Sequence, residues 1–359
     1  MIFERAARRE FAQVAAGVFV ALFAILVSTQ LIRLLNEAAG GRLAPEAVLA
    51  LLGFAALNYL PVLLSLTLFI AILLPLTRAY RDSEMVVWFS AGLPLTAWLR
   101  PVFHFSLPIV IAIAALSLFL TPWAASKSNE YRSKLDARSD AGQVAPGSFQ
   151  EVSSGGRVVF VEKVEENQGF VKNVFVTTVQ DGRVGVVMAD AGRQESMPNG
   201  DRFLVLSHGQ RYEVEPGVAE FRMMEFERYG VRLHDGEARS EASTPRSQPL
   251  KELLQGDSPR EKGELLWRFG QPLAALLLAL LAIPLSFVNP RAGRSMNMLL
   301  AIVVFTLYNN LLSISQAWVA RERLAFELAV WAPHAIMLVV LTLLFYRRLA
   351  VFAFWRRKS

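Results

Sequence analysis

The sequence predicts an α-helical membrane protein with six transmembrane helices and an all-β domain inserted between helices 3 and 4. Apolar residues make up 53% of the 359-residue chain, and only 19% are charged. The apolar residues gather in six stretches that contain no Asp, Glu, Lys or Arg: Phe11–Ile32, Ala47–Thr77, Pro101–Ser126, Phe269–Pro290, Ser295–Ala320 and Leu328–Tyr346. About 20 apolar residues form a helix that crosses the hydrocarbon core of a bilayer. Since lipid offers the backbone no hydrogen-bond partners, we expect six helices, and a soluble enzyme is excluded.

The third and fourth stretches are separated by a segment long enough to fold as a domain. We therefore divide the chain into residues 1–126 (helices 1–3), 127–258 (a β-rich domain with its return linker) and 259–359 (helices 4–6). Short alternating segments separated by turn residues predict antiparallel strands, in a sandwich, roll or open barrel. The strand candidates begin at Arg157, Val171, Arg183, Phe203, Gln210 and Ala219. The segment Gly236–Pro259 is rich in Ser, Pro, Glu and Gln and is typical of a mobile linker.

Basic residues outside the domain predict the orientation of the helices. Placing the N-terminus in the cytoplasm puts 13 Lys and Arg residues inside and four outside, and the positive-inside rule favours this arrangement. Both termini are then expected in the cytoplasm, with the β-rich domain on the other side. The sequence pI of about 9.7 therefore reflects topology, and we expect no nucleic acid partner.

Several kinds of chemistry are missing from the sequence. There are no cysteines, which excludes disulfides and thiolate chemistry. There is no G-x-x-x-x-G-K-[ST] motif to bind nucleotide phosphates. None of the six stretches contains an acid, which disfavours a proton-coupled carrier. His104 and His334 lie in stretches three and six, where we expect hydrogen bonds between helices to satisfy them.

The loop between helices 2 and 3 predicts a short amphipathic helix over about residues 82–91. Asp82 or Ser83 can cap it, and Asp82 and Glu84 lie where the helix dipole favours negative charge. Met85, Trp88 and Phe89 recur at helical spacing. The helix could lie on the lipid surface or dock into a cytoplasmic partner. Two acids in its first turn favour the protein partner, because surface-bound helices prefer Lys and Arg.

These features together resemble the lipopolysaccharide export permease family, LptF/LptG. The resemblance rests on the order and spacing of four strings: LIRLLNEAAGGRLAPEAVLALLG, DSEMVVWFSAGLP, GSFQEVSSGGRVVFVEKV and AIPLSFVNPRAGRSMNMLLAIVVFTLYNNLL. The third and fourth strings are more similar to F-type than to G-type subunits.

The resemblance implies a jelly-roll-like, open β-roll in the periplasm and a place in the inner membrane. It also implies a permease subunit of an ATP-driven complex, with no ATPase motif of its own. The implied partners are a homologous G-type subunit, a cytoplasmic ATPase dimer, lipopolysaccharide, and periplasmic bridge proteins with a similar roll, one of them membrane-anchored. ATP and Mg would be bound by the ATPase, and we expect no cofactor on this chain.

The resemblance and the residue pattern together predict three sites. Asp82, Glu84, Met85, Trp88 and Phe89 are expected to couple the chain to the ATPase. Four arginines that flank the helices on the outer side are expected to bind lipid phosphates: Arg33, Arg42, Arg321 and Arg323. Seven strand residues are expected to form an acyl-chain path, with a closed dry core as the alternative: Val159, Val161, Phe175, Val187, Phe203, Val205 and Phe221.

Two other functions remain open at this point. The chain could be a membrane scaffold without transport activity, whose sheet domain binds a partner protein. It could also belong to another ATP-driven complex that acts on lipoproteins or the cell wall.

Overall fold

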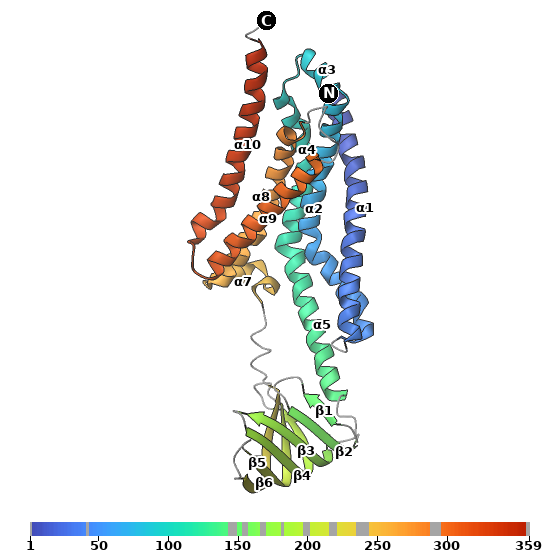
Figure 1. Ribbon diagram of the computed structural model, residues 1–359, viewed down its shortest axis with the longest axis vertical. Coiled ribbons are helices and arrows are strands. Elements are labelled where there is room, and N and C mark those ends of the chain that lie inside the picture. Colours follow the sequence, from blue (N-terminus) through green and yellow to red (C-terminus); the bar gives the residue numbers. More distant parts are fainter. Residues whose placement is uncertain are drawn as a thin grey trace. The chain divides into compact units, whose positions relative to one another are not determined.

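The computed structural model describes residues 2–40, 43–142, 149–152, 157–165, 170–180, 183–196, 202–214, 221–234, 244–287 and 296–356. The chain forms two compact units (Figure 1). One unit contains Met1–Asn129 and Pro245–Ser359, and the other contains Glu130–Thr244.

The first unit is a bundle of long helices. They are α1 (Ile2–Ala39), α2 (Val48–Arg81), α4 (Leu99–Ala115), α8 (Pro259–Leu285), α9 (Met296–Ala320) and α10 (Phe326–Arg356). Two short 3-10 turns, η1 (Pro45–Ala47) and η2 (Leu95–Trp98), lead into α2 and α4, respectively. The short helix α3 (Glu84–Ser90) lies between α2 and η2 along the chain. Among the described residues, six helices are long and apolar enough to cross a membrane, which confirms the predicted number.

The third span is longer than the sequence predicts. α4 continues through a π-helical turn, η3 (Leu116–Leu120), into α5 (Thr121–Gly142). The predicted start of the β-rich domain at residue 127 lies close to the boundary between the two units at Glu130, and α5 continues across that boundary. Charged residues at helical spacing stabilise this extension, since Lys134 Nζ lies 2.6 Å from Glu130 Oε1 one turn away.

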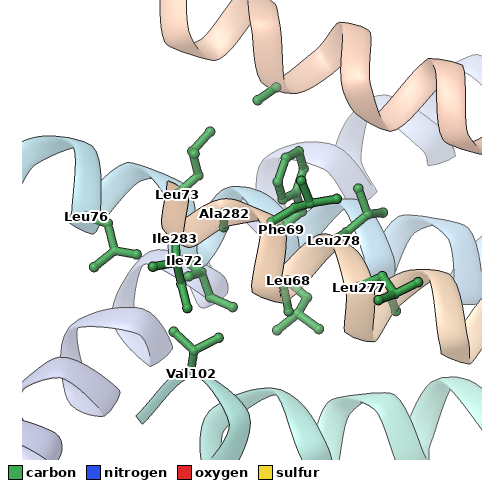
Figure 2. Close-up of a cluster of buried hydrophobic side chains, with 14 of the residues drawn as sticks. Leu68, Phe69, Ile72, Leu73, Leu76, Val102, Leu277, Leu278, Ala282 and Ile283 are labelled. Atoms are coloured by element: carbon green, nitrogen blue, oxygen red, sulfur yellow. The ribbon is translucent and has the colours of Figure 1, made fainter. Parts of the chain in front are cut away.

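The core of the bundle lies where α2 and α8 meet. These are the two spans with most of their residues buried, whereas only 6% of the apolar window of α1 is buried. Figure 2 shows Leu68, Ile72 and Leu76 of α2 gathered against Leu277, Leu278 and Ile283 of α8, with Val102 of α4 beside them. The charge-free run of α2 thus serves packing within the chain, and that of α1 is left for lipid or for another protein.

The second unit holds a six-stranded antiparallel sheet in which every strand pairs with the next along the chain. The strands are β1 (Phe149–Val152), β2 (Arg157–Glu165), β3 (Phe170–Gln180), β4 (Arg183–Ser196), β5 (Arg202–Val214) and β6 (Phe221–His234). Gln180 of β3 pairs with Arg183 of β4, so these two predicted strands form a hairpin. β5 unites the two strand candidates that begin at Phe203 and Gln210.

An irregular line crosses this sheet. Asn173 and His208 have positive φ values of 51° and 52°, and the register of their strands skips both positions. Next to His208, a Cβ on Gly209 would lie 2.2 Å from the carbonyl oxygen of Met188 and 2.6 Å from the ring of Phe226. Only glycine fits this close approach, so position 209 beside the irregular line tolerates no side chain.

The end of the return segment is ordered. Pro245–Ser247 form a 3-10 turn, η4, and Leu250–Gln255 form α7, which packs against α8 through the fully buried Leu253. The prediction of a mobile linker up to Pro259 is therefore wrong for residues 245–258, which belong to the helical unit.

Candidate functional site

The helix α3 lies at the end of the bundle where α2 ends. Ser83 precedes it in the left-handed region, with φ of 61°, and Gly92 follows it with φ of 85°. Ser83 occupies the predicted cap position, but its side chain makes no capping hydrogen bond. The amides of Gly92 and Leu93 donate to the carbonyl oxygens of Phe89 and Trp88, which closes the helix where the sequence predicted its end.

The apolar residues of α3 pack on the chain's own bundle. Met85 is 1% exposed, and Trp88 and Phe89 are half-buried against the same core cluster. The exposed surface of α3 instead consists of Glu84, Val86, Val87 and Ser90, with Val86 and Val87 64% and 65% exposed. We call these four residues the α3 surface. A partner that binds here meets the two valines and Glu84, and Met85 fixes the helix to the bundle.

An arginine connects α3 to two other helices. Arg78 Nη2 of α2 lies 3.0 Å from Glu10 Oε1 of α1 and 3.5 Å from Glu84 Oε2. Arg81 Nε lies 3.1 Å from Asp82 Oδ1 in the turn before α3. Arg78 and Glu84 are both 46% exposed, so water weakens their attraction and each can exchange partners.

Aromatic contacts extend from α3 across the same end of the bundle. The ring of Phe89 lies 6.3 Å from that of Tyr80, and Tyr80 lies 5.4 Å from Phe287, just beyond α8. The Arg348 guanidinium of α10 stacks 3.9 Å above the Phe287 ring. These side chains join α3 with α2, α8 and α10.

The sheet unit carries a groove of about 1060 Å³ along the irregular line. Phe160, Phe175 and Met188 give it an apolar wall, and Asn173, Asp190 and His208 give it a polar one. A buried cluster adjoins the groove and shares Val174 and Phe226 with its lining; the cluster also includes Val176, Val187, Leu204 and Leu206. The groove has space for a ligand, and the cluster is packed.

Two of the seven residues predicted for the acyl path belong to these two features, one to each. Phe175 lines the groove, Val187 is 1% exposed within the cluster, and Val205 is half-buried. Val159 and Val161 pair in register with Val176 and Val174, while Phe203 pairs with Glu195 and Phe221 with Val214. The side chains of these last four predicted residues lie outside the described part of the structure.

Three of the four predicted phosphate-binding arginines are described, and all three are exposed. Arg33 lies near the end of α1, with its Nε 3.4 Å from Glu37 Oε1 one turn further on. Arg321 and Arg323 lie in the turn between α9 and α10. Arg42 lies outside the described residues.

The structure also contains a buried ion pair that the sequence analysis missed. Arg268 Nε lies 3.0 Å from Glu264 Oε1 on α8, and the two side chains are 1% and 8% exposed. The charge-free stretch that predicts the fourth span begins at Phe269, whereas α8 begins at Pro259. The spacing of four residues in ELLWR was the available signal.

The two histidines of the spans differ in their partners. The Tyr308 hydroxyl lies 2.6 Å from Nδ1 of His334, which joins α9 to α10 and confirms the predicted interhelical hydrogen bond. His104 contacts the carbonyl oxygen of Arg100 on its own helix, so the prediction is wrong there. Among the described residues, no three His, Asp or Glu side chains are grouped so that they could hold a metal ion.

The geometry thus gives an exposed α3 surface at the end of the bundle and a β domain with a groove of about 1060 Å³. Residues 5–347 match the family described as lipopolysaccharide export system permease LptF/LptG. The chain is 26% identical over 343 residues to the lipopolysaccharide export system permease protein LptF of Escherichia coli strain K12, which covers 95% of this chain and 93% of that protein. The proteins of the same name from Escherichia coli O157:H7 and Shigella flexneri give the same values.

Proposed function

Since the chain belongs to the LptF/LptG family of lipopolysaccharide export permeases, we propose that it is the F-type subunit of an ATP-driven complex. This complex extracts lipopolysaccharide from the inner membrane and passes it to a periplasmic bridge toward the outer membrane. The observation that carries the proposal is the family match along residues 5–347, together with six membrane-spanning helices and an inserted sheet domain.

The proposed assembly supplies what the chain lacks. A homologous G-type subunit would cover apolar helix surfaces such as that of α1, which has few buried residues. A cytoplasmic ATPase dimer would bind ATP and Mg, since this sequence has no nucleotide-binding motif of its own. Bridge proteins with a similar roll, including a membrane-anchored one, would continue the route beyond the sheet domain.

The proposed orientation assigns a role to each site. The arginine distribution favours cytoplasmic termini, which places the α3 surface on the side of the ATPase. The valines and Glu84 would contact the ATPase, and Met85 would transmit its movement to the bundle. On the outer side, Arg33, Arg321, Arg323 and Arg42 would pair with lipid phosphates, since guanidinium groups bind phosphate bidentately. The groove of the sheet domain would take the acyl chains.

Native mass spectrometry of the gently solubilised complex tests this proposal. We expect a second permease chain, two ATPase chains and bound lipopolysaccharide. A complex without an ATPase would favour the scaffold function instead. An ATPase that accompanies a lipoprotein or a cell-wall precursor would favour the other ATP-driven function, and either result contradicts the proposal.

A further inference from the structure

The helix α8 contains an extensively hydrogen-bonded buried charge that the proposed function does not use. Arg268 is 1% exposed and its Nε bonds Glu264. Its Nη2 donates to the main-chain carbonyl oxygens of Pro245, Arg246 and Gln248 at 3.1, 3.1 and 3.0 Å. These carbonyls belong to the turn through which the chain returns from the sheet unit. The guanidinium therefore holds the returning connector at one point.

The segment that leads from the helices to the sheet unit, the outgoing connector, also bonds to Arg268. Ser117 Oγ donates to the main-chain carbonyl oxygen of Arg268 over 3.0 Å. Ser117 lies in the π-helical turn between α4 and α5, and α5 leads to the sheet. Glu264 Oε2 also accepts from Gln316 Nε2 of α9 at 3.4 Å. Both chain connections to the sheet unit are thus bonded to one residue of α8, with α9 bonded to the adjacent carboxylate.

The opposite end of α8 contacts the α3 region. Phe287 packs on Tyr80, which packs on Phe89 of α3. Arg268 and the last residue of α8, Leu285, are 17 residues apart, which corresponds to about 26 Å of helix rise, close to the thickness of the hydrocarbon core. α8 is also among the two most buried spans. A displacement at the α3 end therefore has a packed, continuous path to both connectors.

The choice of arginine fits a positioning role. Burying an ion pair is weak evidence for stability, because desolvation offsets much of the attraction. Arginine has a planar fork of donors that can bond a carboxylate and several carbonyls at once. Lysine would keep the charge beside Glu264 and lose the fork.

We propose that α8 links the α3 surface to both connectors of the sheet unit, and that Arg268 is the positioning residue that fixes these connectors to it. The attachment of the connectors to Arg268 does not depend on the proposed function, whereas the coupling of lipid transfer to ATP hydrolysis rests on it. When the ATPase moves α3, the connectors follow α8, so lipid transfer stays coupled to ATP hydrolysis. We call the hydrogen bonds of Arg268 to the two connectors the clamp. Without the clamp, ATP hydrolysis continues while lipid transfer to the sheet unit fails.

The first test measures the clamp without lipid or ATP. The chain has no native cysteine, so a single Leu253→Cys change in the buried face of α7 reports detachment of the return segment by its alkylation rate. Adding Arg268→Lys should raise that rate about tenfold, the expected effect of losing a charged hydrogen bond. Phe269→Ala, at an exposed neighbouring position, is the matched control and should leave the rate unchanged. Equal rates in Arg268→Lys and the control would overturn the clamp.

The second test uses the full complex in vesicles that contain lipopolysaccharide. Without the cysteine reporter, Arg268→Lys should keep its ATPase rate and deliver several-fold less lipid per ATP to a soluble acceptor. Ser117→Ala removes only the bond to the outgoing connector, and it should lower the same ratio of lipid to ATP to a smaller extent. This variant takes the place of Arg268→Lys as the test if Arg268→Lys does not fold. Faster alkylation with an unchanged ratio would overturn the coupling role. If the wild type moves no lipid, the proposed function fails, while the alkylation result still decides the clamp.

Discussion

Arg78 and Glu84 form an ion pair that joins the end of α2 to the first residue of α3, with Arg78 Nη2 3.5 Å from Glu84 Oε2. The same nitrogen lies closer to Glu10 of α1, at 3.0 Å. Arg78 therefore keeps a partner when Glu84 leaves it. Glu84 is free to pair with a basic side chain of another protein at little cost to the fold.

The first prediction concerns this exchange. Glu84→Lys should weaken binding of the ATPase about tenfold, because a charge-assisted contact is lost and replaced by repulsion. The stability of the chain itself should change little, since an exposed ion pair contributes about 0–1 kcal/mol. Co-purification of the ATPase with the permease and its stimulated ATPase rate measure the effect.

A charge reversal elsewhere provides the control for Glu84→Lys. Glu130 of α5 is also an exposed acid in an ion pair, with Lys134. Glu130→Lys should leave the ATPase bound and stimulated. Normal assembly and lipid extraction in Glu84→Lys would show that Glu84 has no role in coupling.

The second prediction separates contact with the partner from support of α3. Val87→Asp should reduce ATPase binding without lowering the unfolding temperature of the chain, because Val87 is 65% exposed. Met85→Ala should lower the stability of the bundle by about 2–5 kcal/mol, since it leaves a cavity beside α2. Thermal unfolding and ATPase pull-down, measured on both variants, distinguish the two effects. The reverse pattern would mean that Met85 itself faces the partner.

The helical half of the fold could be predicted because a bilayer imposes a simple rule on sequence. Charge-free stretches located all six spans. The same rule placed the start of the fourth span too late, because Glu264 and Arg268 are buried as a pair and not excluded from the helix. An isolated sequence does not show that three carbonyls of a distant turn will accept from Arg268.

The candidate sites were predicted less completely, for two physical reasons. Helical spacing identified the apolar side of α3 but not what that side packs against. In the structure, Met85 is buried against the chain's own bundle. Alternation identified the strand residues but not which of them line the groove and which belong to the buried cluster. That depends on pairing between strands and on the irregular positions at Asn173 and His208, and no local pattern specifies either.

The third prediction uses the division between groove and cluster. A photo-cross-linking residue at Phe175 should capture lipopolysaccharide during ATP-driven transfer, because Phe175 lines a groove of about 1060 Å³. The same residue at Val187 should capture none, because Val187 is 1% exposed in a packed cluster. Labelled lipid bands on gels, with and without ATP, measure the difference. Capture at Val187 alone would mean that the cluster opens and the groove is not the path.

The last prediction concerns the arginines expected on the outer side of the membrane. Arg33 is 65% exposed, and its 3.4 Å pair with Glu37 spans one helical turn, so it contributes little and can be exchanged for a phosphate. Arg321 is exposed in the turn after α9. The double variant Arg33→Glu, Arg321→Glu should lose most co-purified lipopolysaccharide and most lipid-stimulated ATPase activity, while the complex still assembles.

A matched control for this pair lies on the same helix. Arg8 is also an exposed arginine of α1, close to the opposite end from Arg33. Arg8→Glu should keep the bound lipid, because the proposed orientation places it in the cytoplasm, away from the lipid A phosphates. If Arg33 and Arg321 only extend their charged ends from the helix toward water (snorkelling), their replacement should leave lipid binding unchanged. Wild-type lipid retention in the double variant would leave that as their role and remove the phosphate site.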